Sequence, residues 1–212
     1  MIPRADIAAW ATSVRWPTDE QVEQDLLLSR LIVEISEDPY LGDELVFRGG
    51  TCLHKLYETG AARYSEDLDS GTMRLKVEVN TFERAPARPL VHVRHAVTSP
   101  WFTGAADVQT FDLAELVATK IRALFQRSKG CDLFDLWLAI TQLGVAPQDL
   151  ATCFGPYRPD GYTARRAELN LREKLSSAAF RNDLVPLVGV WPEGYDVDQA
   201  GALILNEVLP LI

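Results

Sequence analysis

The sequence predicts an α+β fold in which a small mixed sheet packs with helices and is followed by a helical C-terminal part. Three observations indicate this class. The expected elements occur in the order α, β, α, β, β, β and then helices only. Apolar and polar residues alternate between positions 75 and 80, which is the period of a half-buried strand. Residues 113–125 instead carry an apolar stripe with the period of a helix. Strands followed by helices are typical of an α+β arrangement.

Composition and charge restrict the class of protein. The chain has 212 residues, enough to bury a good core, and its 47% hydrophobic and 24% charged residues are typical of a globular protein. The net charge of −9 excludes a uniformly basic nucleic-acid binder, so a nucleic-acid partner would require a local basic patch or a bridging metal ion. We expect no membrane span and no signal peptide, because the chain lacks long apolar runs. The three cysteines lack metal-ligand spacing and indicate reduced thiols in a cytoplasm.

The N-terminal half is expected to begin with a long helix and to continue with short strands. Residues 19–37 have the apolar spacing of an amphipathic helix. Gly49 and Gly50 are expected to separate the first strand from a second helix that begins near Thr51. Four strands are predicted, at residues 45–47, 66–70, 73–82 and 90–97.

Two helices are predicted directly after the strands. The first begins with Asp112 and Glu115, whose spacing resembles a capping box, and it is expected to end at Gly130. The second covers residues 131–144, and the rest of the chain is expected to be helical with loops.

Two carboxylates, Asp67 and Asp69, flank Leu68 in the segment RYSEDLDSG. Residues two apart in a strand point to one face, so these carboxylates would lie about 6–7 Å apart and repel each other. Mg²⁺ prefers carboxylate and phosphate oxygens, and the pair therefore predicts a site for Mg²⁺ or Mn²⁺. A solvated acidic turn is the alternative. Glu78, on the polar face of the next expected strand, would add the third carboxylate that two-metal phosphoryl transfer uses, or is an ordinary exposed strand residue.

The glycine pair in VFRGGTCLHKL suggests a place where a phosphate can approach the backbone. Gly49 and Gly50 would permit that approach, and a helix that starts at Thr51 would supply free N–H donors. The spacing is not that of a Walker A loop. An ordinary tight turn between strand and helix is the alternative.

Lys120 falls in the middle of an apolar helical stripe. The stripe consists of Leu113, Leu116, Val117, Ile121 and Leu124. Because lysine is rarely buried without a partner, the ammonium is predicted to reach a carboxylate or a bound triphosphate. The alternative is a side chain that extends along the apolar surface to solvent.

Two aspartates lie near the start of the following helix. Asp132 and Asp135 are three residues apart, so they share one side of that helix. Asp132 is expected to cap the helix. Asp135 lies one turn further in, and the two helices can pack as an antiparallel hairpin, which would bring Asp135 within hydrogen-bonding reach of Lys120.

Four segments of the chain, in this order, resemble the AbiEii/AbiGii nucleotidyltransferase toxins of type IV toxin–antitoxin systems, a family that includes the MenT toxins. The segments, which extend from Phe47 to Trp137, are FRGGTCLHKLY, RYSEDLD, LKVEVNTFER and ELVATKIRALFQRSKGCDLFDLW. The resemblance implies a polymerase-β-like nucleotidyltransferase core over residues 1–110 and a helical C-terminal lobe over residues 111–212. It also implies transfer of a nucleotide from an NTP to RNA, notably to the tRNA acceptor end, which blocks translation. The implied protein partner is a cognate antitoxin.

The resemblance assigns roles to individual residues. The expected nucleotide-binding residues are Arg48, Gly49, Gly50, Thr51, Ser65 and Lys120. The expected catalytic residues are Asp67, Asp69, Lys120 and Asp135. The two aspartates of the D-x-D pair correspond to the family's metal ligands.

The chain departs from the family pattern at two places. The family usually has arginine at the position of Cys131. Relatives also carry some tens of residues between the D-x-D strand and the strand that matches LKVEVN, whereas only residues 70–74 intervene here. Two other functions therefore stay open: a nucleotidyltransferase that acts on a small molecule, and an inactive relative that binds its partner but transfers nothing.

Overall fold

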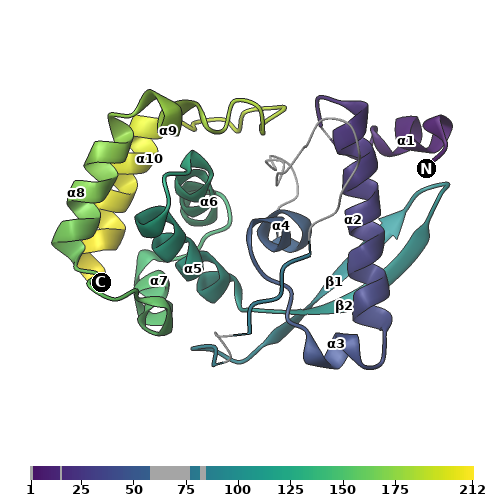
Figure 1. Ribbon diagram of the computed structural model, residues 1–212, viewed down its shortest axis with the longest axis horizontal. Helices are drawn as coiled ribbons and strands as arrows, with labels where there is room; N and C mark the ends of the chain where they lie inside the picture. Colours follow the sequence, from purple (N-terminus) through teal and green to yellow (C-terminus); the bar gives the residue numbers. More distant parts are fainter. Residues whose placement is uncertain (1, 15, 58–76, 82–84) are drawn as a thin grey trace.

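The fold is mixed, with a small sheet and many helices. The computed structural model describes residues 2–14, 16–57, 77–81 and 85–212 (Figure 1). The elements of the N-terminal half are α1 (Arg4–Trp10), α2 (Asp19–Glu37), α3 (Leu41–Glu44), α4 (Gly50–Cys52), the π-helical turn η1 (Leu53–Tyr57), β1 (Val91–Thr98) and β2 (Thr103–Thr110). β1 and β2 pair antiparallel, with Val91 opposite Thr110. An isolated parallel bridge joins Phe47 to Thr110. These elements confirm the predicted α+β class.

Helix α2 forms over the residues that the sequence predicts. Its N-cap is Thr18, whose hydroxyl accepts from the Gln21 backbone N–H at 3.2 Å, while the Gln21 side chain accepts in return from the Thr18 N–H. This capping box satisfies donors that the first turn leaves open. Val22, Leu26 and Val33 are buried in a core shared with β1 and β2, and α2 extends along the sheet in Figure 1.

Helices make up the regular structure of the C-terminal half. They are α5 (Leu113–Gln126), α6 (Gly130–Thr141), α7 (Pro147–Phe154), the 3-10 turn η2 (Gly155–Tyr157), α8 (Ala164–Leu175), α9 (Ala178–Asn182), α10 (Val197–Leu203), the π-helical turn η3 (Ile204–Val208) and the 3-10 turn η4 (Leu209–Leu211). In Figure 1, α5 and α6 lie between the sheet with α2 on one side and α8 with α10 on the other. The division into lobes at residues 110 and 111 stays a prediction. Among the described residues, no helix has the length and apolarity that crossing a membrane requires.

The predicted strands are only partly correct. The strand at 90–97 is confirmed as β1, whereas the one at 45–47 is reduced to the bridge at Phe47. Residues 77–81, the described part of the strand predicted at 73–82, are exposed and have no regular structure, because alternation alone does not supply a pairing strand. The segment 66–70 lies outside the described residues. β2 was not predicted, because TGAADVQT is too poor in large apolar residues to show the alternation.

The two predicted helices after the sheet exist, but their ends differ from the predictions. Asp112 caps α5 by accepting from the Ala114 N–H, yet Glu115 takes no part in a capping box. The Glu115 carboxylate is fully buried and accepts from the backbone N–H groups of Ala87 and Arg88 and from the Tyr157 hydroxyl. Gly130 does not end α5 but begins α6.

The reason for a glycine at position 130 is close packing. A Cβ atom there would come within 2.4 Å of the Phe180 carbonyl oxygen, so the start of α6 approaches α9 more closely than any side chain permits. Cys52, Cys131 and Cys153 are buried and free of disulfides, as predicted.

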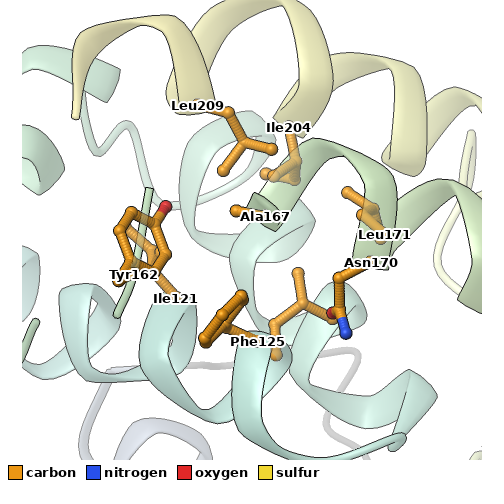
Figure 2. A pocket seen from close by; sticks show the side chains of 9 residues that line it. Ile121, Phe125, Tyr162, Ala167, Asn170, Leu171, Ile204 and Leu209 are labelled. Carbon is orange, nitrogen blue, oxygen red and sulfur yellow. The ribbon is translucent and has the colours of Figure 1, made fainter. Parts of the chain in front are cut away.

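A small cavity lies between α5, α8 and the C-terminal turns (Figure 2). It measures about 10 Å³, close to the minimum that one water molecule needs, and its lining is almost entirely apolar. Tyr162 borders it, and the buried Tyr162 hydroxyl finds no hydrogen-bond partner among the described residues. Burial raises the pKa of Tyr162 to about 12. None of the residues with predicted functional roles lines this cavity.

The substitution Tyr162→Phe is expected to stabilise the fold. A buried hydroxyl without a partner costs about 1–3 kcal/mol, so its removal should raise the free energy of unfolding by about 1 kcal/mol, or Tm by about 2–4 °C. Tyr157→Phe is the matched control and should lower Tm, because the Tyr157 hydroxyl donates to the buried Glu115 carboxylate at 2.5 Å. Thermal melting of both variants tests this, and a lower Tm for Tyr162→Phe would contradict it.

Candidate functional site

Lys120 and Asp135 form a buried ion pair between α5 and α6. Lys120 Nζ lies 2.8 Å from Asp135 Oδ2 and 3.6 Å from Asp132 Oδ1. The Lys120 side chain is 6% exposed and both aspartate side chains are fully buried. The predicted approach of Lys120 to Asp135 is thus confirmed, and extension of the lysine to solvent is excluded. The short connection at 127–129 lets the two helices pack side by side, which places the pair at their interface.

His54 joins this pair from a distant part of the chain. Its Nε2 atom lies 3.0 Å from Asp135 Oδ1, so the two oxygens of one carboxylate bind Lys120 and His54. The His54 ring stacks on Phe134, with centroids 6.4 Å apart and an interplanar angle of 23°. No role was predicted for His54 from the sequence. The available signal was its position four residues after Gly50, on one face of the helix that follows the glycine pair.

Asp132 does not cap α6, contrary to the prediction. The N-cap of α6 is Lys129, and the Asp132 carboxylate is held by both ends of the Arg127 guanidinium, with Nε at 2.6 Å and Nη2 at 2.7 Å. Two-point contacts of this kind are among the strong charge-assisted hydrogen bonds. The cations Lys120 and Arg127 therefore balance two carboxylates that are both fully buried.

Lys55, the residue after His54, anchors the turn η1 to a different helix, α2. Lys55 Nζ lies 2.5 Å from Asp25 Oδ1 and 2.8 Å from Ser29 Oγ, both on α2. Trp10 Nε1 donates to the other oxygen of Asp25 at 2.8 Å. Burial lowers the pKa of Lys55, and the nearby Asp25 carboxylate opposes that shift. The π-helical turn η1 is thus fixed to α6 through His54 and to α2 through Lys55, and α4 and η1 lie between these helices in Figure 1. Such π-turns are frequent at functional sites.

The glycine pair forms the predicted turn into a helix. Gly49 has a φ angle of 98°, a backbone conformation that residues with a side chain rarely adopt. A Cβ atom at this position would meet nothing within 4 Å. Glycine is therefore required by the backbone conformation and not by crowding. α4 begins at Gly50, one residue before the predicted Thr51. The preceding Phe47 is held to β2, because its N–H donates to the Gln109 carbonyl at 2.9 Å. The role of this turn in binding phosphate stays a prediction.

Of the three predicted metal ligands, the structure describes only Glu78. Asp67 and Asp69, with the nearby Ser65, lie outside the described residues. Glu78 is exposed in the irregular segment 77–81 and not on a strand. In the described parts of the chain, no group of three or more histidine, cysteine, aspartate or glutamate residues could hold a metal ion. The fit of a divalent cation therefore rests on the chemistry of the donors, because carboxylates are the ligands that Mg²⁺ and Mn²⁺ prefer.

Comparison with known proteins finds one family. A family model described as "Nucleotidyl transferase AbiEii toxin, Type IV TA system" matches residues 30–72 and 70–200. The two stretches meet at residues 70–72, within the connection that the sequence predicts to be shortened. Comparisons with curated proteins and with solved structures find no significant match. The glycine-pair turn, the D-x-D pair and the Lys120–Asp135 pair all fall inside the matched stretches, which cover most of the 212 residues. The chain belongs to the AbiEii family of nucleotidyl transferase toxins of type IV toxin–antitoxin systems.

Proposed function

We propose that this protein is a metal-dependent nucleotidyltransferase that moves a nucleoside monophosphate from an NTP to RNA. The proposed acceptor is the 3′ end of tRNA, and the consequence is a block of translation in the cytoplasm. Family membership supports a toxin of the nucleotidyltransferase class and implies both an NTP substrate and an antitoxin partner. We further propose a polymerase-β-like core over residues 1–110 and a helical lobe over residues 111–212.

The observation that carries this proposal is the carboxylate of Asp135 shared between Lys120 and His54. It ties the turn that follows the glycine pair to the two helices that bear the buried charges. The carboxylate offsets the cost of burying the ammonium group. Lys120 is therefore held in one position, as a preorganised cation for NTP phosphates should be.

The remaining roles follow from the segments around this pair. Arg48, Gly49, Gly50, Thr51 and Ser65 would bind the nucleotide, with backbone N–H groups directed at its phosphates. Asp67 and Asp69, with Glu78, would hold Mg²⁺ or Mn²⁺. When bound, a divalent cation neutralises charge on the transferring phosphate group.

Transfer of label from α-labelled NTPs to total tRNA tests the proposal. Each of the four NTPs is incubated with the protein and Mg²⁺ or Mn²⁺, with a chelator as control. We expect label in tRNA with at least one NTP, and none in the presence of the chelator. Label only on an added small acceptor would favour the small-molecule enzyme. No label, with retained binding to the antitoxin, would favour an inactive relative. This is the second candidate because the family match divides into two stretches that overlap at residues 70–72.

A further inference from the structure

Four side chains form a row in which two arginines cover two aromatic rings. Arg48 Cζ lies 5.1 Å from the centre of the Phe111 ring, and Arg122 Cζ lies 6.0 Å from the centre of the Tyr157 ring. The two rings are themselves 6.3 Å apart. Phe111 and Tyr157 are buried, whereas both arginines are partly exposed. The rings thus form a fixed platform that brings two guanidinium groups to the same part of the surface.

The position of this row relates it to the proposed site. Arg48 directly precedes Gly49, the residue whose backbone makes the turn into α4. Arg122 follows Lys120 by two residues on α5, which turns its side chain roughly 200° around the helix. The buried ammonium of Lys120 and the partly exposed guanidinium of Arg122 therefore leave α5 on different sides. No role was predicted for Arg122, whereas the resemblance to the family implies that Arg48 is a nucleotide-binding residue.

The two guanidinium groups of the row, those of Arg48 and Arg122, are close enough for their positive charges to repel each other. Burial lowers the pKa of both Arg48 and Arg122, and the charge of Arg48 lowers the pKa of Arg122 further. Among the described residues, Tyr157 and the buried Glu115 carboxylate raise the pKa of Arg48, and Glu115 accepts three hydrogen bonds from other groups. A bound anion that contacts both guanidiniums would be attracted by both positive charges. The planar donor fork of arginine suits the oxygens of a phosphate group.

We propose that Arg48 and Arg122 together bind a phosphate group of a ligand, with Phe111 and Tyr157 holding the two guanidiniums in place. The phosphate group could belong to the NTP or to the backbone of the acceptor RNA, and in naming these two ligands the inference rests on the proposed function. The row stands beside the glycine-pair turn, where either ligand would pass.

Direct binding of ligands to the parent protein tests the proposal without any need for transfer. Calorimetry measures the affinity for tripolyphosphate and for ATP with Mg²⁺, and fluorescence anisotropy measures the affinity for total tRNA. The variants are Arg48→Gln, Arg122→Gln and their combination, each checked for folding by thermal melting. Arg158→Gln is the matched control, because Arg158 also lies over two rings, Phe154 at 5.7 Å and Tyr162 at 5.8 Å.

We expect each single variant to weaken binding about tenfold, because it loses a charge-assisted contact to the phosphate group. The weakened probes should be ATP and tripolyphosphate if the ligand is the NTP, and tRNA if it is the acceptor RNA. The Arg158→Gln variant should bind like the parent. Weaker binding of ATP and tripolyphosphate would identify the NTP as the source. Weaker binding of tRNA alone would identify the acceptor RNA. In that case the slope of the logarithm of the binding constant against the logarithm of the salt concentration should also fall by about one per arginine removed.

Parent-like binding of all three probes by both single variants would overturn the proposal, and so would a parent protein that binds none of them. If a glutamine variant does not fold, Arg48→Lys and Arg122→Lys take its place, because lysine keeps the charge and loses the two-point contact. A protein that transfers no nucleotide but loses phosphate binding in these variants would contradict the proposed function and support this site.

Discussion

Replacing Lys120 or Asp135 by alanine is expected to abolish nucleotide transfer, and the double variant should be hardly worse than either single one. The two side chains are 2.8 Å apart and share burial, so each depends on the other to stay in position. Residues that act as one unit show this kind of non-additivity. The measurement is the initial rate of label transfer from NTP to tRNA for the three variants and the parent.

Stability has to be separated from chemistry in this test. Removing one partner of a buried ion pair costs about 3–5 kcal/mol, so Lys120→Met and Asp135→Asn accompany the alanine variants as changes closer in shape. Lys174→Met is the matched control, because it also removes a buried ammonium group, which donates to the carbonyl oxygens of Phe125 at 3.2 Å and Arg127 at 2.9 Å. We expect Lys174→Met to lose stability but to retain transfer per folded molecule. Transfer within a few-fold of the parent in folded Lys120→Met and Asp135→Asn would show that the pair is structural only.

Asp67→Ala and Asp69→Ala are each expected to abolish transfer while the fold remains intact. The reason is the proposed metal site, where the loss of one carboxylate ligand removes much of the charge neutralisation that the cation supplies. Loss of one of two neighbouring like charges should leave Tm unchanged or raise it. The same transfer assay and thermal melting measure both effects.

Asp107→Ala serves as the control for this pair of variants. Asp107 is an exposed aspartate on β2 that lies 3.4 Å from Arg94, and its loss changes the net charge by the same amount. Transfer by Asp107→Ala should match that of the parent. Full activity in either Asp67→Ala or Asp69→Ala would remove these residues from the site, and equal loss in the Asp107 variant would point to a general effect of charge.

Patterns that lie within a few neighbouring residues were sufficient to predict much of this protein. The apolar spacing of residues 19–37 predicts the range that α2 takes. The apolar stripe of α5 predicts that Lys120 is buried, and the short connection to α6 predicts that Asp135 can reach it. Four short segments resemble the AbiEii family, and the family model matches the chain at residues 30–72 and 70–200. Such features depend on helix and strand periods, which are properties of the backbone.

Only the tertiary structure decided which buried polar groups far apart in the chain become partners. His54 meets Asp135 across 81 positions of sequence, and Tyr157 meets Glu115 across 42. Glu115 and Asp132 looked like helix caps because capping is a local pattern, yet both are fully buried and held by groups outside their own helices. A buried carboxylate must be hydrogen-bonded, but the donor that reaches it depends on which element packs over it. That packing joins residues far apart in the chain, so no local spacing contains it.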